Sequence, residues 1–296
     1  MTTAQLEVQQ VHGPSALGGG WKRFFRLTWL VAKTDFKLTY FGSVLGYLWS
    51  LVQPLLFFGV LYLMFSVVLQ LGKTTPDFPV LLLMNIVLFN YFQQATGGSI
   101  PSVVQRENLV RKMHFPRLVI PIATVLTATF NLLLNFIVVV AFMLAYGVHP
   151  RPTWLLLPVI LLLLFAFASG VAMLLSALYV RYRDVAPIWG VISQTLFYAS
   201  PVFILIEQIQ VRAPGVVRYY LFNPIAAILQ QARHWMVGVA PVPSPSPGGP
   251  RFVGFGPAAY MGGHVWLLVP AGILVFVFVL GFRVFSAKAP LIAEEL

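Results

Sequence analysis

Few side chains in this sequence could carry out acid–base, nucleophilic or metal chemistry, and their spacing argues against an enzyme. The chain of 296 residues has 8 Asp and Glu residues, 5 His residues and no Cys. Without Cys there is no disulfide, thiolate metal ligand or cysteine nucleophile. The histidines lack the close spacing of a metal site, since they stand at His12, His114, His149, His234 and His264. The carboxylates fall in predicted tails or loops, so we expect no catalytic residue, no metal and no cofactor in this chain.

The sequence also lacks a complete phosphate-binding loop. Gly72, Lys73 and Thr74 are similar to the end of such a loop, but the pattern requires a glycine where this chain has Val67. An ATPase domain needs on the order of 100 residues, and no predicted cytosolic segment approaches that length. The predicted spans also lack the ionisable relay of a proton-coupled transporter, apart from His264 near an end. If the chain takes part in transport, these absences favour energy that is supplied from outside the chain.

The composition is that of an integral membrane protein. Hydrophobic residues make up 59% of the chain and charged residues 9%, against about 25% charged in a soluble domain. Apolar runs that reach the roughly 20 residues of a membrane-spanning helix occur at about 46–69, 78–100, 118–146, 153–179, 186–206 and 264–285, and they are uncharged apart from Arg283 near the end of the last one. We predict an all-α membrane protein with six transmembrane helices within residues 38–285 and a cytosolic tail at 286–296.

Basic residues indicate the orientation of these helices. The net charge is +11, and in membrane proteins lysine and arginine concentrate on the cytosolic side. With the N-terminus inside, the outer segments hold only six of the 19 lysines and arginines, namely Lys73, Arg151, Arg212, Arg218, Arg233 and Arg251. This places both termini in the cytosol and accounts for the positive charge without a nucleic-acid partner.

The N-terminal segment divides into a tail and an amphipathic helix. Residues 1–20 are polar and end in three glycines, which predicts a flexible tail. From 21 to 37, aromatic residues recur on one helical face, and another face carries the cations Lys22, Arg26, Lys33 and Lys37. Such a helix is suited to the headgroup layer of a membrane, where the cations would contact lipid headgroups. The alternative is a cytosolic helix packed on protein.

The predicted cytosolic segment between the second and third spans reads ENLVRKMHFPRLVIP from 107 to 121. Glu107 and Arg111 are spaced i, i+4 and can pair on one helix face. Pro116 forces the residue before it out of helical geometry, so a short cytosolic helix over about 102–115 should end there. The alternative is a positively charged loop that only fixes topology.

A second charged cluster stands directly before the fifth predicted span. Arg181, Arg183 and Asp184 would be costly in hydrocarbon, so they indicate a boundary with water on the cytosolic side. Pro201 lacks an N–H and should kink or end the helix within the membrane. An ordinary kinked membrane helix would also fit this pattern.

Aromatic and amide side chains in the spans are candidates for lining a passage. Aromatic faces can stack on sugar rings, and the candidates are Tyr47, Trp49, Phe57, Phe197 and Tyr198. Interfacial belts and ordinary packing are the alternative for each of them. Polar residues inside the spans fit either helix–helix hydrogen bonds or a hydrated path, and they are Gln53, Asn85, Asn90, Gln93, Gln94, Asn131, Asn135 and Gln194.

The predicted outer segment before the last span, 207–261, is long and varied. Asn223-Pro224 is a turn signal before an apolar stretch that can form a short helix. Residues 241–250 are rich in Pro, Ser and Gly, which indicates an irregular exposed loop. Before that loop we expect short interfacial or re-entrant helices.

Together these features resemble the membrane subunits of type-2 ABC exporters, especially those that export polysaccharides such as O-antigen, teichoic acid or galactan. The resemblance covers nearly the whole chain. It is carried by the fifth-helix segment 181–204 and by Asn108, Leu109, Arg111, Lys112, Phe115, Pro116 and Pro121. It implies a coupling helix that docks on an ATP-binding partner, with the coupling residues Glu107, Asn108, Leu109, Arg111, Lys112 and Phe115.

The resemblance further implies a homodimer with two ATP-binding subunits, which would bind ATP and Mg, and a pore lined largely by the first and fifth spans. The expected substrate is a lipid-linked polysaccharide, moved across the plasma (inner) membrane of a bacterium with its lipid in the bilayer. Export of a drug or lipid is the second hypothesis. A membrane-embedded transferase is the third, and it would need a pair of acidic groups that Asp35, Asp184 and Glu207 do not obviously form.

Overall fold

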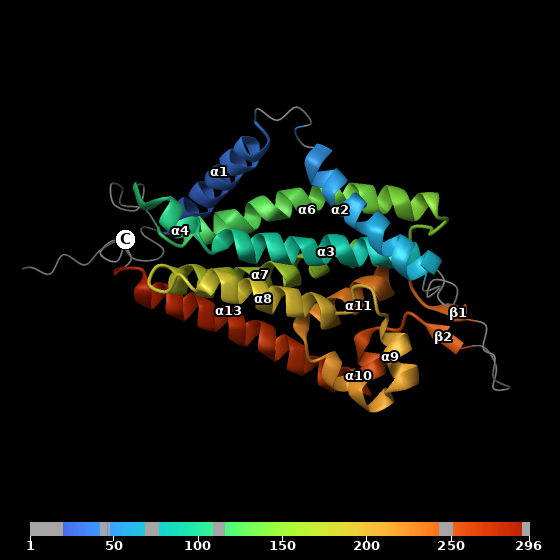
Figure 1. Cartoon of the computed structure of the whole chain (residues 1–296). Helices are drawn as coiled ribbons and strands as arrows, with labels where there is room; N and C mark the ends of the chain where they lie inside the picture. Colours follow the sequence, from blue (N-terminus) through green and yellow to red (C-terminus); the bar gives the residue numbers. More distant parts are fainter. Residues whose placement is uncertain are drawn as a thin grey trace, which may run out of the picture.

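The computed structural model describes residues 20–41, 46, 48–68, 77–108, 116–242 and 251–291. Over these residues the chain is helical apart from one short hairpin (Figure 1). The first half contains α1 (Trp21–Tyr40), α2 (Leu48–Tyr62), the π-helical turn η1 (Leu63–Val68), α3 (Phe78–Ser99), α4 (Ser102–Gln105) and α6 (Val119–Ala145). The second half contains η3 (Pro152–Leu156), α7 (Leu157–Tyr179), α8 (Val185–Tyr198), α9 (Ile206–Arg212), α10 (Pro214–Tyr220), α11 (Pro224–Met236), β1 (Ala240–Val242), β2 (Arg251–Val253), α12 (Pro257–Met261), η4 (His264–Leu267) and α13 (Leu268–Lys288).

Five helical segments of the described residues are long and apolar enough to cross a membrane. They are Leu48–Val68, Phe78–Ser99, Val119–Ala145, Pro152–Tyr179 and His264–Lys288. These segments confirm the predicted helical membrane fold. The remaining predicted span, 186–206, contains α8, which is only 14 residues long. The count of six spans therefore stays a prediction.

Helix α3 occupies the centre of the bundle. In Figure 1, α3, α6, α7, α8 and α13 run alongside one another. α3 is buried along most of its length, and its apolar side chains form the main hydrophobic core together with residues of α6 and α7. Most of α3 therefore meets neighbouring helices, whereas its polar residue Gln94 is exposed.

Helix α13 crosses α7 at close range because each helix has a glycine at the contact. A Cβ atom at Gly281 would lie 2.1 Å from the carbonyl oxygen of Gly170. A Cβ atom at Gly170 would lie 2.7 Å from the Cα atom of Phe278. Small residues at helix crossings allow membrane helices to approach in this way. The contact fixes the last span against α7.

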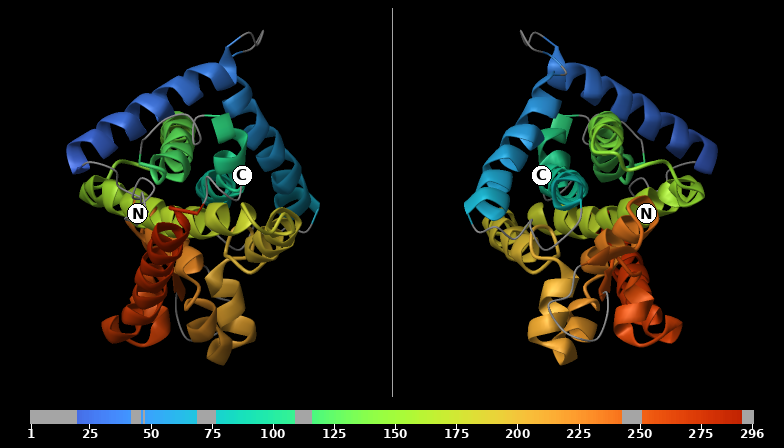
Figure 2. Two further views of the ribbon diagram at one scale, coloured as in Figure 1. Left: turned by 90° about the vertical axis from the view of Figure 1, so that its left-hand side faces the viewer. Right: turned by 90° about the vertical axis from the view of Figure 1, so that its right-hand side faces the viewer.

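Helix α1 lies across the bundle instead of along it, as the view down the bundle in Figure 2 shows. The hydroxyl of Tyr40 donates a hydrogen bond of 2.7 Å to Asn131 Oδ1 of α6, and Thr127 Oγ1 donates to the carbonyl oxygen of Ala32 at 3.3 Å. The face of α1 that packs on the protein contains the buried residues Phe24, Thr28 and Ala32. A second aromatic face, with Trp21, Phe25 and Trp29, is exposed. The helix thus packs on protein with one face and leaves another available to a membrane surface.

The outer segment folds into short helices and a hairpin at the end of the bundle opposite α4 (Figure 1). α11 begins at Pro224, and Asn223 Oδ1 caps it by accepting a hydrogen bond of 3.0 Å from the Ile225 N–H. The prediction of an irregular loop is wrong for Pro241 and Val242, which pair with β2. Proline is tolerated there because both strands of a two-stranded hairpin are edges. Residues 243–250 lie outside the described part of the chain.

Candidate functional site

A partly open cavity of about 660 Å³ lies between α2, α3 and α8. Its polar lining consists of Gln53, Asn90, Gln93 and Gln194. Its aromatic lining consists of Phe57, Phe65, Phe197, Tyr198 and Phe203, and Leu61 and Met64 complete the wall. We call this space the amide–aromatic cavity.

The four amides of this cavity come from three helices. Gln53 belongs to α2 and Gln194 to α8, whereas Asn90 and Gln93 lie one turn apart on the same face of α3. None of the four side chains makes a hydrogen bond to another residue of the described part. Each amide offers both donors and an acceptor without charge, and leaving these groups without partners in an apolar environment costs free energy. The cavity is therefore suited to water or to a ligand rich in hydroxyl groups.

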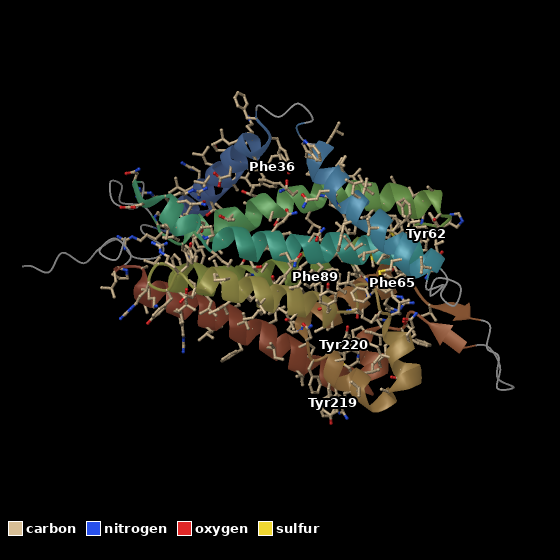
Figure 3. The ribbon with its side chains drawn as sticks, in the orientation of Figure 1. Phe36, Tyr62, Phe65, Phe89, Tyr219 and Tyr220 are labelled. Carbon is tan, nitrogen blue, oxygen red and sulfur yellow. The ribbon has the colours of Figure 1, made fainter. Side chains whose placement is uncertain are left out.

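The aromatic residues form a connected series along the cavity wall. The rings of Phe57 and Phe197 have centroids 5.9 Å apart, and Phe197 lies 5.8 Å from Phe203. Phe203 stacks on Phe65 of η1 at 4.8 Å with an interplanar angle of 23°. Phe89 supports Phe197 from α3 at 5.2 Å (Phe65 and Phe89 are labelled in Figure 3). The wall thus presents large ring surfaces that are held by their neighbours.

Side chains of α3 and the outer segment hold the end of α8. The helix ends at Tyr198, and its chain turns through residues 199–204 around Pro201. Asn85 Nδ2 donates a hydrogen bond of 2.7 Å to the carbonyl oxygen of Pro201. Asn223 Nδ2 donates to the carbonyl oxygen of Ala199 at 3.3 Å. A break inside a membrane requires such partners, because lipid offers none to a free carbonyl group.

The predicted lining residues have different positions in the structure. Phe57, Phe197 and Tyr198 line the amide–aromatic cavity. Trp49 is in the first turn of α2 with 52% of its surface exposed, and it is not among the lining residues. Tyr47 lies outside the described residues. From the sequence, the four amides fit either helix–helix hydrogen bonds or a hydrated path, and Phe65 was not a lining candidate.

The predicted coupling segment follows α4 directly. Glu107 and Asn108 are described and helical, whereas Leu109, Arg111, Lys112 and Phe115 lie outside the described residues. The pairing of Glu107 with Arg111 therefore stays a prediction. After the segment, the buried Arg117 donates from Nη1 to the carbonyl oxygen of Ala289, just beyond α13.

The turn between α7 and α8 and the start of α1 lie at the same end of the bundle as α4, which we call the α4 end (Figure 1). Arg181, Arg183 and Asp184 are exposed in the turn between α7 and α8. The guanidinium carbon of Arg183 lies 4.9 Å from the ring centroid of Tyr179. The cations proposed for headgroup contact are exposed along α1, at Lys22, Arg26, Lys33 and Lys37.

At the opposite end, which we call the hairpin end, Glu207 of α9 is surrounded by donors. Its carboxylate pairs with Arg233 of α11 and accepts hydrogen bonds from the Tyr260 hydroxyl (2.7 Å) and the Gly254 N–H (2.9 Å). Burial by itself would raise the pKa of Glu207, but the charge of Arg233 and the hydrogen bonds together lower it below its ordinary value. The site holds an ionised carboxylate and joins α9, α11, α12 and the hairpin.

No group of three or more His, Asp or Glu residues that could hold a metal ion occurs among the described residues. Two of the carboxylates considered for transferase chemistry have arginine partners, since Asp35 pairs with Arg106 and Glu207 with Arg233. Asp35 of α1 and Glu207 of α9 thus belong to separate ion pairs, and no contact between the two carboxylates is found among the described residues.

The fold and the cavity are those of a multi-pass membrane protein with a polar space between its helices. Residues 26–237 match the model of the family described as ABC-2 type transporter. Because this match covers well over half of the chain, the chain belongs to the ABC-2 type transporter family. The resemblance to type-2 ABC membrane subunits is thereby confirmed, and family membership implies pairing with an ABC ATP-binding subunit.

Three curated relatives of this chain are each named O-antigen export system permease protein RfbA. One from Klebsiella pneumoniae is 28% identical over 217 residues, which are 73% of this chain and 82% of the relative. A second from Klebsiella pneumoniae is 28% identical over 206 residues, or 69% of this chain and 78% of the relative. One from Myxococcus xanthus is 29% identical over 201 residues, or 67% and 75%.

Proposed function

We propose that this chain is the membrane subunit of an ATP-driven exporter that moves a lipid-linked polysaccharide from the cytosolic side across the inner membrane of a bacterium. The amide–aromatic cavity is the observation that carries this proposal. The hydroxyl groups of a polysaccharide are costly to place in hydrocarbon, and uncharged amides can both donate to them and accept from them. The export of O-antigen by three relatives, according to their names, supports the same class of substrate.

The lining of the cavity is also suited to a polymer that must keep moving. None of the residues that line it is charged, so no strong ionic contact would retain a sugar unit. The aromatic rings offer flat surfaces on which successive sugars can stack, and one ring can replace another as the chain advances. This lining favours a glycan over a small apolar drug or a lipid, for which a closed apolar chamber would be the better fit.

The proposed working unit is a homodimer of this chain with two ATP-binding subunits, which bind ATP and Mg. The second copy would close the open side of the cavity, since α2 and α8 expose large apolar side chains such as Leu56, Val60, Ile188 and Val191. In this arrangement the α4 end and both termini face the cytosol. The coupling segment from Glu107 to Phe115 contacts the ATP-binding subunit, and the cations of α1 contact lipid headgroups.

Depletion of the protein in its own cell tests the proposal. Finished, lipid-linked polymer should accumulate on the cytosolic face of the inner membrane, and fractionation of lipid-linked glycans would measure it and reveal the substrate. Normal surface glycans after depletion would overturn the proposal and favour export of a drug or lipid.

Complementation of the depleted cell then tests the cavity itself. A variant with both Asn90→Leu and Gln93→Leu should reach a normal protein level in the membrane without restoring export. Gln94→Leu is the matched control, because Gln94 is the next residue of α3 and is not among the residues that line the cavity. Equal export by the two variants would show that the amides of Asn90 and Gln93 are not needed for export.

A further inference from the structure

Helix α1 has one carboxylate among its cations, and that carboxylate is paired. Asp35 forms an ion pair with Arg106. Arg106 is the residue that follows α4 and precedes Glu107, so it stands at the start of the proposed coupling segment. The pair therefore links the interface helix α1 to the segment proposed to contact the ATP-binding subunit.

The two partners are anchored to different parts of the protein. Arg106 follows α4, in which Ser102 and Val103 are buried and the Ser102 hydroxyl donates to the carbonyl oxygen of Ser99 at 2.7 Å. Asp35 belongs to a helix that packs on α6 and that directly precedes α2 in the chain. Because α2 lines the amide–aromatic cavity, α1 is the element between the coupling segment and the first wall of the cavity.

The surroundings of the pair are those of a contact that can be broken and made again. The side chains of Arg106 and Asp35 are 25% and 26% exposed, and ion pairs open to water contribute little to stability. Arg106 Nη1 is buried and has no hydrogen-bond partner in the described part of the chain. Exposure to water, and not this donor, distinguishes the pair, because Arg233 Nε in the buried pair with Glu207 also lacks a partner among the described residues.

We propose that the Asp35–Arg106 ion pair passes movement of the coupling segment to α1, and through α1 to the cavity wall formed by α2. Asp35 and Arg106 are then positioning residues, which act through α1 without touching the transported molecule. The proposal rests on the proposed function, because it requires an ATP-binding subunit that moves the coupling segment.

Two fluorescent reporters can separate movement of the coupling segment from movement of α1. The sequence has no Cys, so one introduced Cys carries a label at a known place. Gln105→Cys at the exposed end of α4 reports the coupling segment, and Thr39→Cys at an exposed position reports α1. The chain is purified with its ATP-binding subunit, placed in lipid nanodiscs and trapped with ATP and vanadate.

With the pair intact, both labels should change their fluorescence on trapping. In Asp35→Asn or Arg106→Gln the Gln105 label should keep its response, while the Thr39 response should be lost, because the contact that passes the movement to α1 is gone. The charge exchange Asp35→Arg with Arg106→Asp should restore the Thr39 response. A merely structural role would not give this rescue together with the selective loss at one label.

Asp77→Asn is the matched control, since it removes another carboxylate, at the start of α3, and it should leave both responses unchanged. An undiminished Thr39 response in Asp35→Asn would overturn the proposal. So would loss of both responses in that variant, because the pair would then organise the coupling segment itself. If neither label responded with the pair intact, the proposed function would fail at the coupling step, and this inference would fail with it.

Discussion

The Glu207–Arg233 ion pair at the hairpin end and the Asp35–Arg106 ion pair near the α4 end differ in how completely the protein surrounds them. Arg233 and Glu207 at the hairpin end are 3% and 12% exposed, and two further donors satisfy the carboxylate. The side chains of Arg106 and Asp35 are both more exposed than these two, at 25% and 26%. No further donor to the Asp35 carboxylate is found among the described residues.

This difference assigns different mechanical roles to the two pairs. A buried pair is expensive to break, because the partner that remains is an unpaired charge away from water. A pair that water can reach is broken at little cost. The Glu207 network should therefore fix the short helices at the hairpin end, whereas the Asp35 pair is available for movement.

The largest effect is expected when one partner of the buried pair is removed. Glu207→Ala leaves the guanidinium of Arg233 buried and unpaired, which should destabilise the protein by about 3–5 kcal/mol. Thermal or SDS-induced unfolding of the purified protein would measure the loss. The double variant Glu207→Met with Arg233→Met leaves no charge behind and should recover most of the stability. If the single and double variants were equally unstable, packing and not charge would explain the effect.

An intermediate effect is expected at the hydrogen bond that holds the end of α8. Asn85→Leu removes the donor to the carbonyl oxygen of Pro201, and an unsatisfied buried carbonyl group costs about 1–3 kcal/mol. Unfolding measurements should show this loss, and hydrogen exchange should become faster between 199 and 205. Asn90→Leu is the control on the same helix, because Asn90 faces the cavity and its loss should leave stability nearly unchanged. Equal destabilisation by both variants would contradict the role of Asn85.

The contrast between Asn85 and Asn90 also shows what could be predicted from the sequence. Uncharged runs and flanking charges predict the membrane fold, because hydrocarbon excludes charge wherever a helix crosses it. The turn at Asn223-Pro224 is equally local, since both residues act on their own backbone. Which amide of α3 meets a carbonyl group and which meets the cavity depends on the helix opposite. The spacing of residues in α3 contains no such information.

The ion pairs were beyond prediction for the same reason. Asp35 and Arg106 are 71 residues apart in the sequence, and Glu207 and Arg233 are 26 apart. Each pair exists because tertiary packing brings two helices together, and neither has the i, i+4 spacing that suggested a partner for Glu107. The aromatic candidates Phe57 and Phe197 do line the amide–aromatic cavity, but their place in a channel stays a prediction, and the partner ring Phe65 was not among the candidates.

A smaller effect on stability, which depends on pH, is expected from the Glu207 carboxylate at the hairpin end. Because the pKa of Glu207 is lowered on folding, its contribution to stability is fully present above about pH 4.5 and is lost as the pH falls through the lowered folded-state value. The difference in melting temperature between the wild-type protein and Glu207→Gln should therefore be large at pH 7 and narrow below pH 4.5. A difference that stayed constant into acid would show that the carboxylate is not ionised in the folded protein.

The smallest effect on stability is expected at the exposed pair, even though its effect on coupling should be large. Asp35→Asn removes an ion pair that water already screens, so the cost should be about 0–1 kcal/mol. The unfolding midpoint should stay close to that of the wild-type protein, while export in the complemented cell falls. A loss of stability comparable with that of Glu207→Ala would erase the contrast between the two pairs. Asp35 would then stabilise the fold as Glu207 does. The loss of stability alone would explain reduced export by Asp35→Asn, without any transmission of movement.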